Sequence, residues 1–388
     1  MPRVLQRVAN RLPAVFRTPP AVDSLLARDA RKRERAAQRE RVRTERRAAD
    51  AERRRQRRET AERAREAMLA RDLAAARAHE LYFQLRPWAE HLEQQSRAVP
   101  LTVSERRMID ALAPVWNSTP ETIATLRQWC DPDSAARTSE YDDGSSELGK
   151  RLRRDLKRLF AEVGRDLFVP EPALLGGYGF ETRGQRYNAD TLRSFNALVA
   201  LLDGGVLNAF RGSTSRHLVW EFGGGWGGFA YQFKSICPNT TYVISGAPTF
   251  LLVAAIYVMT VFPEARCRLE GDAFGDLWSG WEDTDFVFVS EAALPALRPP
   301  RVDLAIDITA LEGMTAQRVE SHVQWAYDRG CRYFYSLHPG GVSYDAMPAV
   351  WTAIGARYWL HPVPPRLEVD KVVEIDFSHV IGWARLRV

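Results

Sequence analysis

The spacing of hydrophobic and polar residues changes along this chain of 388 residues, and each pattern predicts a different structure. Residues 27–75 carry almost no large apolar side chains, whereas residues 76–165 repeat them at helical spacing. From residue 217 onward, short β-rich runs alternate with helical runs. This alternation is typical of a parallel sheet covered by helices. We therefore predict an α/β fold: a Rossmann-like sheet with helices on both faces, preceded by a helical subdomain and a long charged N-terminal helix.

The pattern divides the chain into four segments. We predict a flexible basic tail over residues 1–26, a long helix rich in Arg, Glu and Ala over 27–75, a helical cap subdomain over 76–205 and the Rossmann-like domain over 206–388. Prolines interrupt the tail, and the alternative for it is a short basic amphipathic helix on an anionic membrane surface. The long helix lacks an apolar seam, so we expect a solvated helix stabilised by charge pairs, not a stable coiled coil.

Individual elements of the Rossmann-like domain can be located from the same runs. The predicted strands are His217–Phe222, Thr240–Ser245, Val302–Ile308 and Arg332–Leu337, with Ala356–Val363 and Val372–Leu386 as a closing antiparallel hairpin. The predicted helices between them are Gly227–Ile236, Thr249–Phe262 and Val319–Arg329. Residues 285–290 form an alternative third strand.

Charge and composition argue against several classes of function. The net charge is +5, but Arg28 to Glu66 holds 17 basic and 9 acidic residues, so the rest of the chain is slightly acidic. We therefore predict no specific nucleic-acid binding, and expect the charged helix to space the protein or to dock to an acidic partner or membrane surface. Four dispersed cysteines and no long apolar run favour a cytoplasmic protein, peripherally membrane-associated at most. No spacing of acids and histidines predicts a metal site.

The segment Glu221–Phe229 carries the strongest chemical signal, because a glycine-rich turn here follows a strand and opens a helix. Gly223, Gly225 and Gly228 match the dinucleotide pattern GxGxxG. Counted from Glu221, the same turn also matches an acidic pattern ExGxGxG, which adds Gly227. A carboxylate at the strand end would repel a pyrophosphate but would suit the ammonium and sulfonium charges of S-adenosylmethionine. We therefore predict S-adenosylmethionine as the cofactor, held by Glu221 and the glycines 223, 224, 225 and 227.

Several segments together resemble the sugar O-methyltransferases, a family of class I S-adenosylmethionine-dependent enzymes. The resemblance covers about residues 166–340 and rests on GGYGF at 176–180, YNADTL at 187–192 and EFGGG at 221–225, and continues through 251–263, 303–306 and 333–335. It implies methyl transfer to a sugar hydroxyl during surface glycan assembly, with a nucleotide sugar or a glycan as the acceptor. It also implies that Tyr187 and Asn188 form a lid over the cofactor.

The chain departs from this family at the end of the second predicted strand. An acid that holds both ribose hydroxyls is expected there, but Ser245 and Gly246 follow instead. A neutral hydroxyl binds less strongly than a carboxylate, so cofactor affinity is expected to be reduced or activity lost. Asp272, in a Gly-Asp turn, is the predicted partner of the adenine amino group. If residues 285–290 form the third strand, Ser290 or Glu291 takes that position.

A sugar hydroxyl is weakly acidic, so a general base helps its methylation. Asp307 follows the fourth predicted strand, Glu312 lies close to it in sequence, and His338 ends the fifth. These three residues are the candidates, since open α/β sites form at the carboxyl ends of strands. For Asp307 the alternative is capping of the next turn, and for His338 it is packing in a loop.

Two other functions remain open at this point. A protein that has lost activity and keeps the fold as an interaction scaffold would account for the missing ribose acid. An NAD-dependent oxidoreductase would use the GxGxxG pattern, but Glu221 and the missing second-strand acid argue against it.

Overall fold

A computed structural model describes residues 19–130, 138–271, 276–339, 347–364 and 377–385 of the chain. The chain forms two compact units, residues 1–69 and residues 70–388, and helix α2 (Pro19–Ser96) contributes to both. Within the described residues, no helix combines the length and the apolar composition that a membrane crossing requires.

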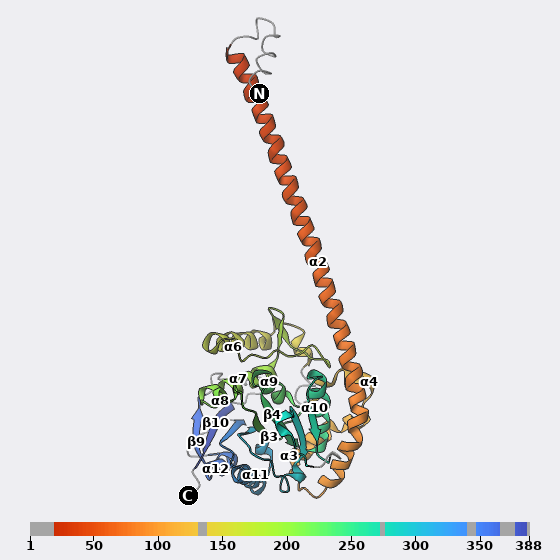
Figure 1. Ribbon diagram of the computed structural model, residues 1–388, viewed down its shortest axis with the longest axis vertical. Coiled ribbons are helices and arrows are strands. Elements are labelled where there is room, and N and C mark those ends of the chain that lie inside the picture. The colour runs from red at the N-terminus through yellow and green to blue at the C-terminus, as the bar shows by residue number, and fades with distance from the viewer. Residues whose placement is uncertain (1–18, 131–137, 272–275, 340–346, 365–376, 386–388) are drawn as a thin grey trace. The chain divides into compact units, whose positions relative to one another are not determined.

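Helix α2 changes its surroundings along its length (Figure 1). In residues 24–69 the described side chains are exposed, and pairs one turn apart such as Arg55 and Glu59 (2.9 Å) support the helix. From Ala78 onward, residues three or four apart become buried, among them Leu81, Leu85 and Leu92. The change of composition at residues 75–76 therefore marks the point where the helix enters the core of the second unit, and not the end of the helix.

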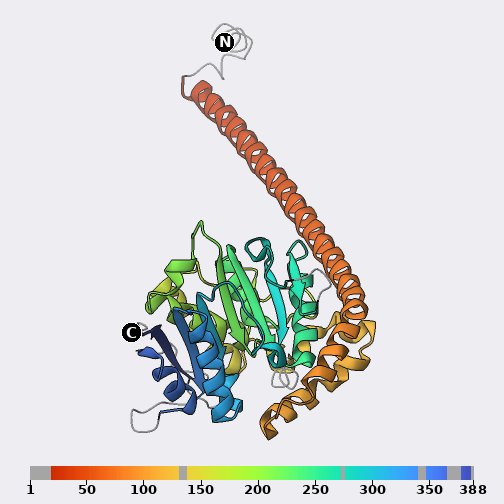
Figure 2. The same cartoon turned by 60° about the horizontal axis from the view of Figure 1, so that its bottom comes forward.

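An eight-stranded sheet forms the centre of the second unit, in the order β5-β6-β4-β3-β7-β8-β10-β9 (Figure 2). Its strands are β3 (His217–Phe222), β4 (Thr240–Gly246), β5 (Cys267–Leu269), β6 (Phe286–Ser290), β7 (Leu304–Ile308), β8 (Tyr333–Pro339), β9 (Tyr358–Val363) and β10 (Phe377–Ala384). Strands β3 to β8 pair in parallel, and β10 pairs antiparallel with both β8 and β9. A separate hairpin is made of β1 (Phe180–Thr182) and β2 (Gln185–Tyr187).

Helices cover both faces of this sheet (Figure 1). Because side chains alternate along a strand, Val219 faces one core with Ile244 and Ile306, whereas Trp220 faces the other with Ala305. The helices are α3 (Val103–Leu112), α4 (Pro120–Ala124), α6 (Glu147–Val163), α7 (Ala189–Asp203), α8 (Leu207–Phe210), α9 (Gly228–Ile236), α10 (Pro248–Val261), α11 (Ala316–Asp328) and α12 (Ala349–Gly355). Helices α7, α9 and α10 belong to the first core, and α11 and α12 to the second.

The predicted α/β class with a Rossmann-like sheet is confirmed, and the strand positions agree within two residues at β3, β4, β7 and β8. The alternative third strand is also present, as β6, and it separates β4 from β5. The closing hairpin forms from β9 and the described part of residues 372–386, with β10 inserted next to β8. The sequence patterns missed the β1–β2 hairpin and α12. One core extends from Ala78 to Ile381, so the helical block and the sheet share buried residues; the boundary at 205–206 stays a prediction.

Candidate functional site

The glycine turn lies where the sheet reverses its strand order. From β3 the chain continues to β4, to the edge strand β5 and to β6 between them, then returns to β7 on the other side of β3. In open α/β sheets, ligands bind outside the carboxyl ends of the strands at such a switch point. The turn that follows β3 has positive φ at Gly223 (62°), Gly225 (52°) and Gly227 (84°). Side chains disfavour this backbone conformation, so the glycines are required by the turn itself.

One side of the turn is packed against neighbouring residues, and the other side faces open space. A Cβ at Gly223 would clash with Ala310, and one at Gly227 would come within 2.9 Å of Val258. At Gly225 a Cβ would meet no atom within 4 Å, and at Gly246 only Gly223 at 3.8 Å. Backbone is therefore exposed to an open space in front of Gly225 and Gly246, which is the arrangement that lets a ligand approach main-chain N–H groups.

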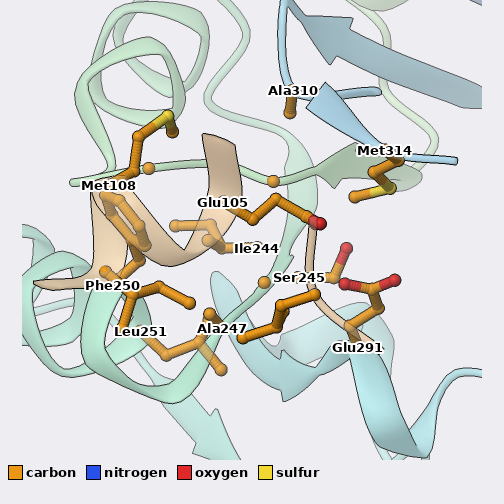
Figure 3. A pocket seen from close by; sticks show the side chains of 15 residues that line it. Glu105, Met108, Ile244, Ser245, Ala247, Phe250, Leu251, Glu291, Ala310 and Met314 are labelled. Carbon is orange, nitrogen blue, oxygen red and sulfur yellow. The ribbon is translucent and has the colours of Figure 1, made fainter. Parts of the chain in front are cut away.

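This space is a pocket of about 100 Å³ (Figure 3). Met108, Phe250 and Leu251 form one side, and Ala310 and Met314 the opposite side. The remaining lining residues come from the glycine turn, from the strand ends and from the start of α3 and the loop before it: Leu101, Glu105, Ile109, Gly223, Gly225, Ile244, Ser245, Gly246, Ala247 and Glu291. The wall is mostly apolar with two carboxylates, so it suits a flat apolar ring that carries polar groups at its edge.

Glu221 lies beneath the turn. Its side chain is 2% exposed, and the hydroxyl of Tyr242 donates a hydrogen bond to its Oε2 at 3.0 Å. A Cβ at Gly224 would come within 2.9 Å of the same Oε2. Burial raises the pKa of Glu221 to about 8, and the nearby Asp307 adds to the rise. The carboxyl is therefore mostly neutral at pH 7, and a cation that approached the turn would stabilise its charged form.

Ser245 lines the pocket, but its hydroxyl forms hydrogen bonds to neighbouring residues of the sheet. The hydroxyl donates to the carbonyl oxygen of Glu221 at 2.9 Å and accepts from the indole N–H of Trp220 at 3.0 Å. It therefore has little capacity left for a ribose hydroxyl, which is the role that the sequence predicts for it. Gly246, its neighbour, offers only backbone to the pocket.

Asp307 is buried at the end of β7, beside Phe222 in the register of the sheet. Its Oδ1 accepts the backbone N–H of Leu311 at 3.0 Å, and its Oδ2 accepts the hydroxyl of Ser336 at 2.8 Å. Burial raises the pKa of Asp307 to about 6, although both hydrogen bonds oppose the rise. Both oxygens of Asp307 are thus engaged, so the geometry favours the capping role over the role of a base that touches substrate. Like Glu221, Glu312 and His338, Asp307 is not one of the residues that line the pocket.

The structure brings the other two candidates together. Nε2 of His338, at the end of β8, lies 2.7 Å from Oε2 of Glu312, in the short turn that follows β7. The residues on either side of this turn, Ala310 and Met314, line the pocket. Because a carboxylate only accepts, Nε2 carries the proton and Nδ1 keeps a free lone pair. Nδ1 is buried and has no hydrogen-bond partner among the described residues.

The predicted lid residues lie in the interior. Tyr187 and Asn188 are both 0% exposed, and neither lines the pocket. Asn188 caps α7: its side-chain oxygen accepts from Thr191, and its amide donates to Glu171 at 3.1 Å. This placement corrects the expectation of a lid, since a buried cap cannot cover a ligand. Asp272 lies outside the described residues, so its contact with adenine stays a prediction.

Three features of the site were missed from the sequence. Helix α3 forms one pocket wall, and its capping box of Thr102 and Glu105 was a readable signal. Arg318 bridges two pocket acids: Nη1 is 2.7 Å from Glu105, and Nη2 is 2.6 Å from Glu291. No local pattern could have joined residues this far apart in the sequence.

The third feature is a buried charge cluster behind the glycine turn. The guanidinium of Arg127 lies 3.9 Å from the ring centre of Trp226, which is part of the turn. Its side chain is 0% exposed and pairs with Glu171 at 2.8 Å and with Asp190. The cluster therefore anchors the turn to the segments around residues 127, 171 and 190.

Comparisons with known proteins give matches among solved structures alone. No protein-family model matches the chain, and no curated protein matches it. Among solved structures, a carbon methyltransferase named CurJ is 11% identical, with a TM-score of 0.36 over 83% of this chain and 97% of that one. Magnesium protoporphyrin IX methyltransferase from Synechocystis, solved with S-adenosylhomocysteine, is 11% identical, with a TM-score of 0.33 over 64% and 100%.

A precorrin-6y C5,15-methyltransferase from Geobacter metallireducens is 12% identical, with a TM-score of 0.30 over 49% of this chain and 87% of that one. All three are named as methyltransferases, and the Synechocystis enzyme has also been solved with S-adenosylmethionine. At such scores and identities the fold assignment rests on the strand order of this chain itself, and what those proteins methylate says nothing of this one.

Proposed function

We propose that this protein is an S-adenosylmethionine-dependent methyltransferase that acts on a sugar hydroxyl during glycan assembly. The observation that carries the proposal is the glycine turn at the switch point, with an open pocket in front of Gly225 and a buried carboxyl, Glu221, behind it. The sugar acceptor, a nucleotide sugar or a glycan, is supported by the sequence resemblance described above alone. The lining of the pocket gives no separate support for it.

The pocket fits the two ends of such a cofactor. Exposed backbone at Gly223 and Gly225 suits the amino-acid end, where Glu221 would meet an ammonium group. The apolar side chains of Ile244, Phe250 and Leu251 suit a purine ring. When bound, S-adenosylmethionine supplies an electrophilic methyl group on a sulfonium.

The pocket is narrower than its proposed ligand. Its volume of about 100 Å³ is below the roughly 300–1,000 Å³ that is typical of small-molecule sites. One wall is the short helix α3, in which Met108 is 47% exposed and which is tied to the sheet domain by hydrogen bonds from Thr102 to Gly313 and from Arg318 to Glu105. We therefore expect α3 to shift outward when the cofactor binds, because it is a short helix outside the sheet and its lining residue Met108 is largely exposed.

His338 and Glu312 supply the proton chemistry in this proposal. Glu312 accepts the Nε2–H of His338, so the lone pair of the neutral ring lies on Nδ1. As the acceptor oxygen takes the methyl group, its proton passes to Nδ1, and the carboxylate of Glu312 stabilises the imidazolium that forms. Asp307 stays a structural acid in this scheme, because it positions the turn that carries Ala310 and Leu311.

The test is calorimetric titration of the full chain with S-adenosylmethionine, S-adenosylhomocysteine and NAD. We expect micromolar binding of the first two, lost in Gly225→Asp. The matched control is Gly212→Asp, because Gly212 also has positive φ (75°) and a Cβ there would also meet no atom within 4 Å, but Gly212 lies outside the pocket. Binding of NAD alone would support an oxidoreductase instead, and binding of none of the three would support an inactive scaffold.

A further inference from the structure

The end of β4 carries no carboxylate for the ribose of the proposed cofactor. A ribose presents two hydroxyl donors, and a carboxylate accepts them more strongly than a neutral group does. Ser245 has already used its hydroxyl on Glu221 and Trp220, and Gly246 has no side chain. Any carboxylate for the ribose must therefore come from another element.

The neighbouring strand places a carboxylate beside this gap. Strand β6 pairs in parallel with β4, and Ser290 lies opposite Gly246 in the register. Glu291 follows immediately, as the first residue of a short 3-10 turn whose start Ser290 caps. Glu291 lines the same pocket as Ser245 and Gly246, and Figure 3 labels Glu291 and Ser245 in its wall.

Arg318 fixes the orientation of this carboxylate. Nε of Arg318 donates to Oε1 of Glu291 at 3.0 Å, and Nη2 lies 2.6 Å from each carboxylate oxygen. His322 is 3.4 Å from Oε1. Oε1 is thus the more heavily engaged oxygen, whereas Oε2 has one donor among the described residues and keeps a lone pair for a ligand.

The second acid of the pocket wall, Glu105, belongs to the helix on the other side. Its Oε2 accepts the backbone N–H of Thr102 at 2.8 Å and Nη1 of Arg318 at 2.7 Å. The bond from Thr102 closes the capping box of α3. Glu105 therefore holds the start of α3 with one oxygen, whereas Glu291 is the pocket acid that follows the strand paired with β4.

We propose that Glu291 binds the ribose hydroxyls of the cofactor in place of the missing acid at the end of β4, and that Arg318 is its positioning residue. The proposal rests on the function proposed above. It assigns the ribose to the end of β6, the neighbour of β4 in the sheet, and leaves Ser245 as a sheet-stabilising residue.

The test compares ligands with and without ribose hydroxyls. Wild-type protein and Glu291→Gln are titrated with S-adenosylhomocysteine and with its 2′-deoxy and 3′-deoxy analogues. In the wild type, at least one deoxy analogue is expected to bind about tenfold more weakly or worse. The quantity compared is the dissociation constant of the deoxy analogue divided by that of S-adenosylhomocysteine. In Glu291→Gln this ratio should fall to about two, because S-adenosylhomocysteine loses affinity and the analogue does not. The fitted stoichiometry counts the folded fraction, so partial unfolding does not imitate this result.

Glu105→Gln is the matched control, since it also removes a charged partner of Arg318 at the same wall. Glu105→Gln is expected to change the affinities for S-adenosylhomocysteine and for the deoxy analogue by the same factor, so that the ratio of the two stays as in the wild type. Glu291→Asp, which keeps the charge but withdraws it by one methylene, should lower the ratio as well. An unchanged ratio in both Glu291 variants would overturn the assignment of Glu291 alone. Failure of the wild type to bind S-adenosylhomocysteine would overturn the proposed function with it.

Discussion

Nε2 of His338 and Oε2 of Glu312 lie 2.7 Å apart, although 25 intervening residues separate them in the sequence. The pair forms because β7 and β8 are parallel neighbours whose carboxyl ends reach the same edge of the sheet. The carboxylate orients the ring and selects its tautomer, which is how a histidine is prepared to accept a proton.

His338→Asn is expected to lower kcat of methyl transfer by about 10²–10⁴-fold, the range for loss of a general base. Glu312→Gln should cause a smaller loss, because the ring remains but its orientation is less constrained. Binding of S-adenosylhomocysteine should be unchanged in both, as measured by calorimetry. The control is His361→Asn, an exposed histidine on β9. Equal kcat in wild type and His338→Asn would remove His338 from the chemistry.

Cofactor binding is expected to release a proton from Glu221. The pKa of Glu221 is about 8 in the free protein, so the group is mostly protonated at pH 7. A ligand ammonium lowers this pKa, so the proton leaves on binding and affinity rises as the pH increases from 6 to 8. Calorimetry at pH 7 in buffers of different ionisation enthalpy measures the released protons. Glu221→Gln should abolish the release; an equal release in that variant would mean that another group titrates.

His379 is expected to destabilise the protein in mild acid. Its Nδ1 is 2.8 Å from the hydroxyl of Tyr335 and its Nε2 is 3.0 Å from the amide of Asn196, and burial lowers its pKa to about 4. Between pH 6.5 and 4 the unfolded chain binds a proton that the folded chain does not, so stability falls as the pH falls. The contribution is at most about 3 kcal/mol.

The measurement is the free energy of unfolding at pH 7.0 and 4.5 for the wild type and His379→Gln. The variant should be less stable at pH 7 by about 1 kcal/mol, because two hydrogen bonds are disturbed, and should lose less stability on acidification. His361→Gln is the control for an exposed histidine. Parallel pH profiles for wild type and His379→Gln would contradict the prediction.

Arg127→Met is expected to destabilise the fold by about 3–5 kcal/mol, because it leaves the buried Glu171 without its partner cation. It should also weaken S-adenosylhomocysteine binding, since Arg127 lies against Trp226 of the glycine turn. Urea unfolding and calorimetry measure the two effects. Arg158→Met removes an exposed arginine paired with Glu162 and should change stability by less than about 1 kcal/mol. A stable variant with normal ligand affinity would show that the cluster does not support the turn.

Local patterns were sufficient for much of the fold. The strand-turn-helix around Glu221 was located within one residue, because alternating burial, the glycines and the amphipathic helix α9 all lie within about twenty residues. The extent of α2 was not recognised, because the change from exposed to buried composition near residue 75 was taken as a boundary, although one helix continues through it. Tyr187 and Asn188 were assigned to a lid through the family resemblance alone, whereas the structure shows a buried strand residue and the buried N-cap of α7.

The amino-acid sequence by itself determined the class of fold, the glycine turn and the residue types at the strand ends, since these depend on periodicity and on backbone conformations that only glycine adopts readily. The neighbours of each strand end were decided by the tertiary structure. Inserting β6 beside β4 brings Glu291 to the pocket that Ser245 also lines, and the pairing of β7 with β8 brings Glu312 to His338. Arg318 meets Glu105 across 213 positions of chain. Such contacts follow from the order in which strands pair, and no local pattern encodes that order.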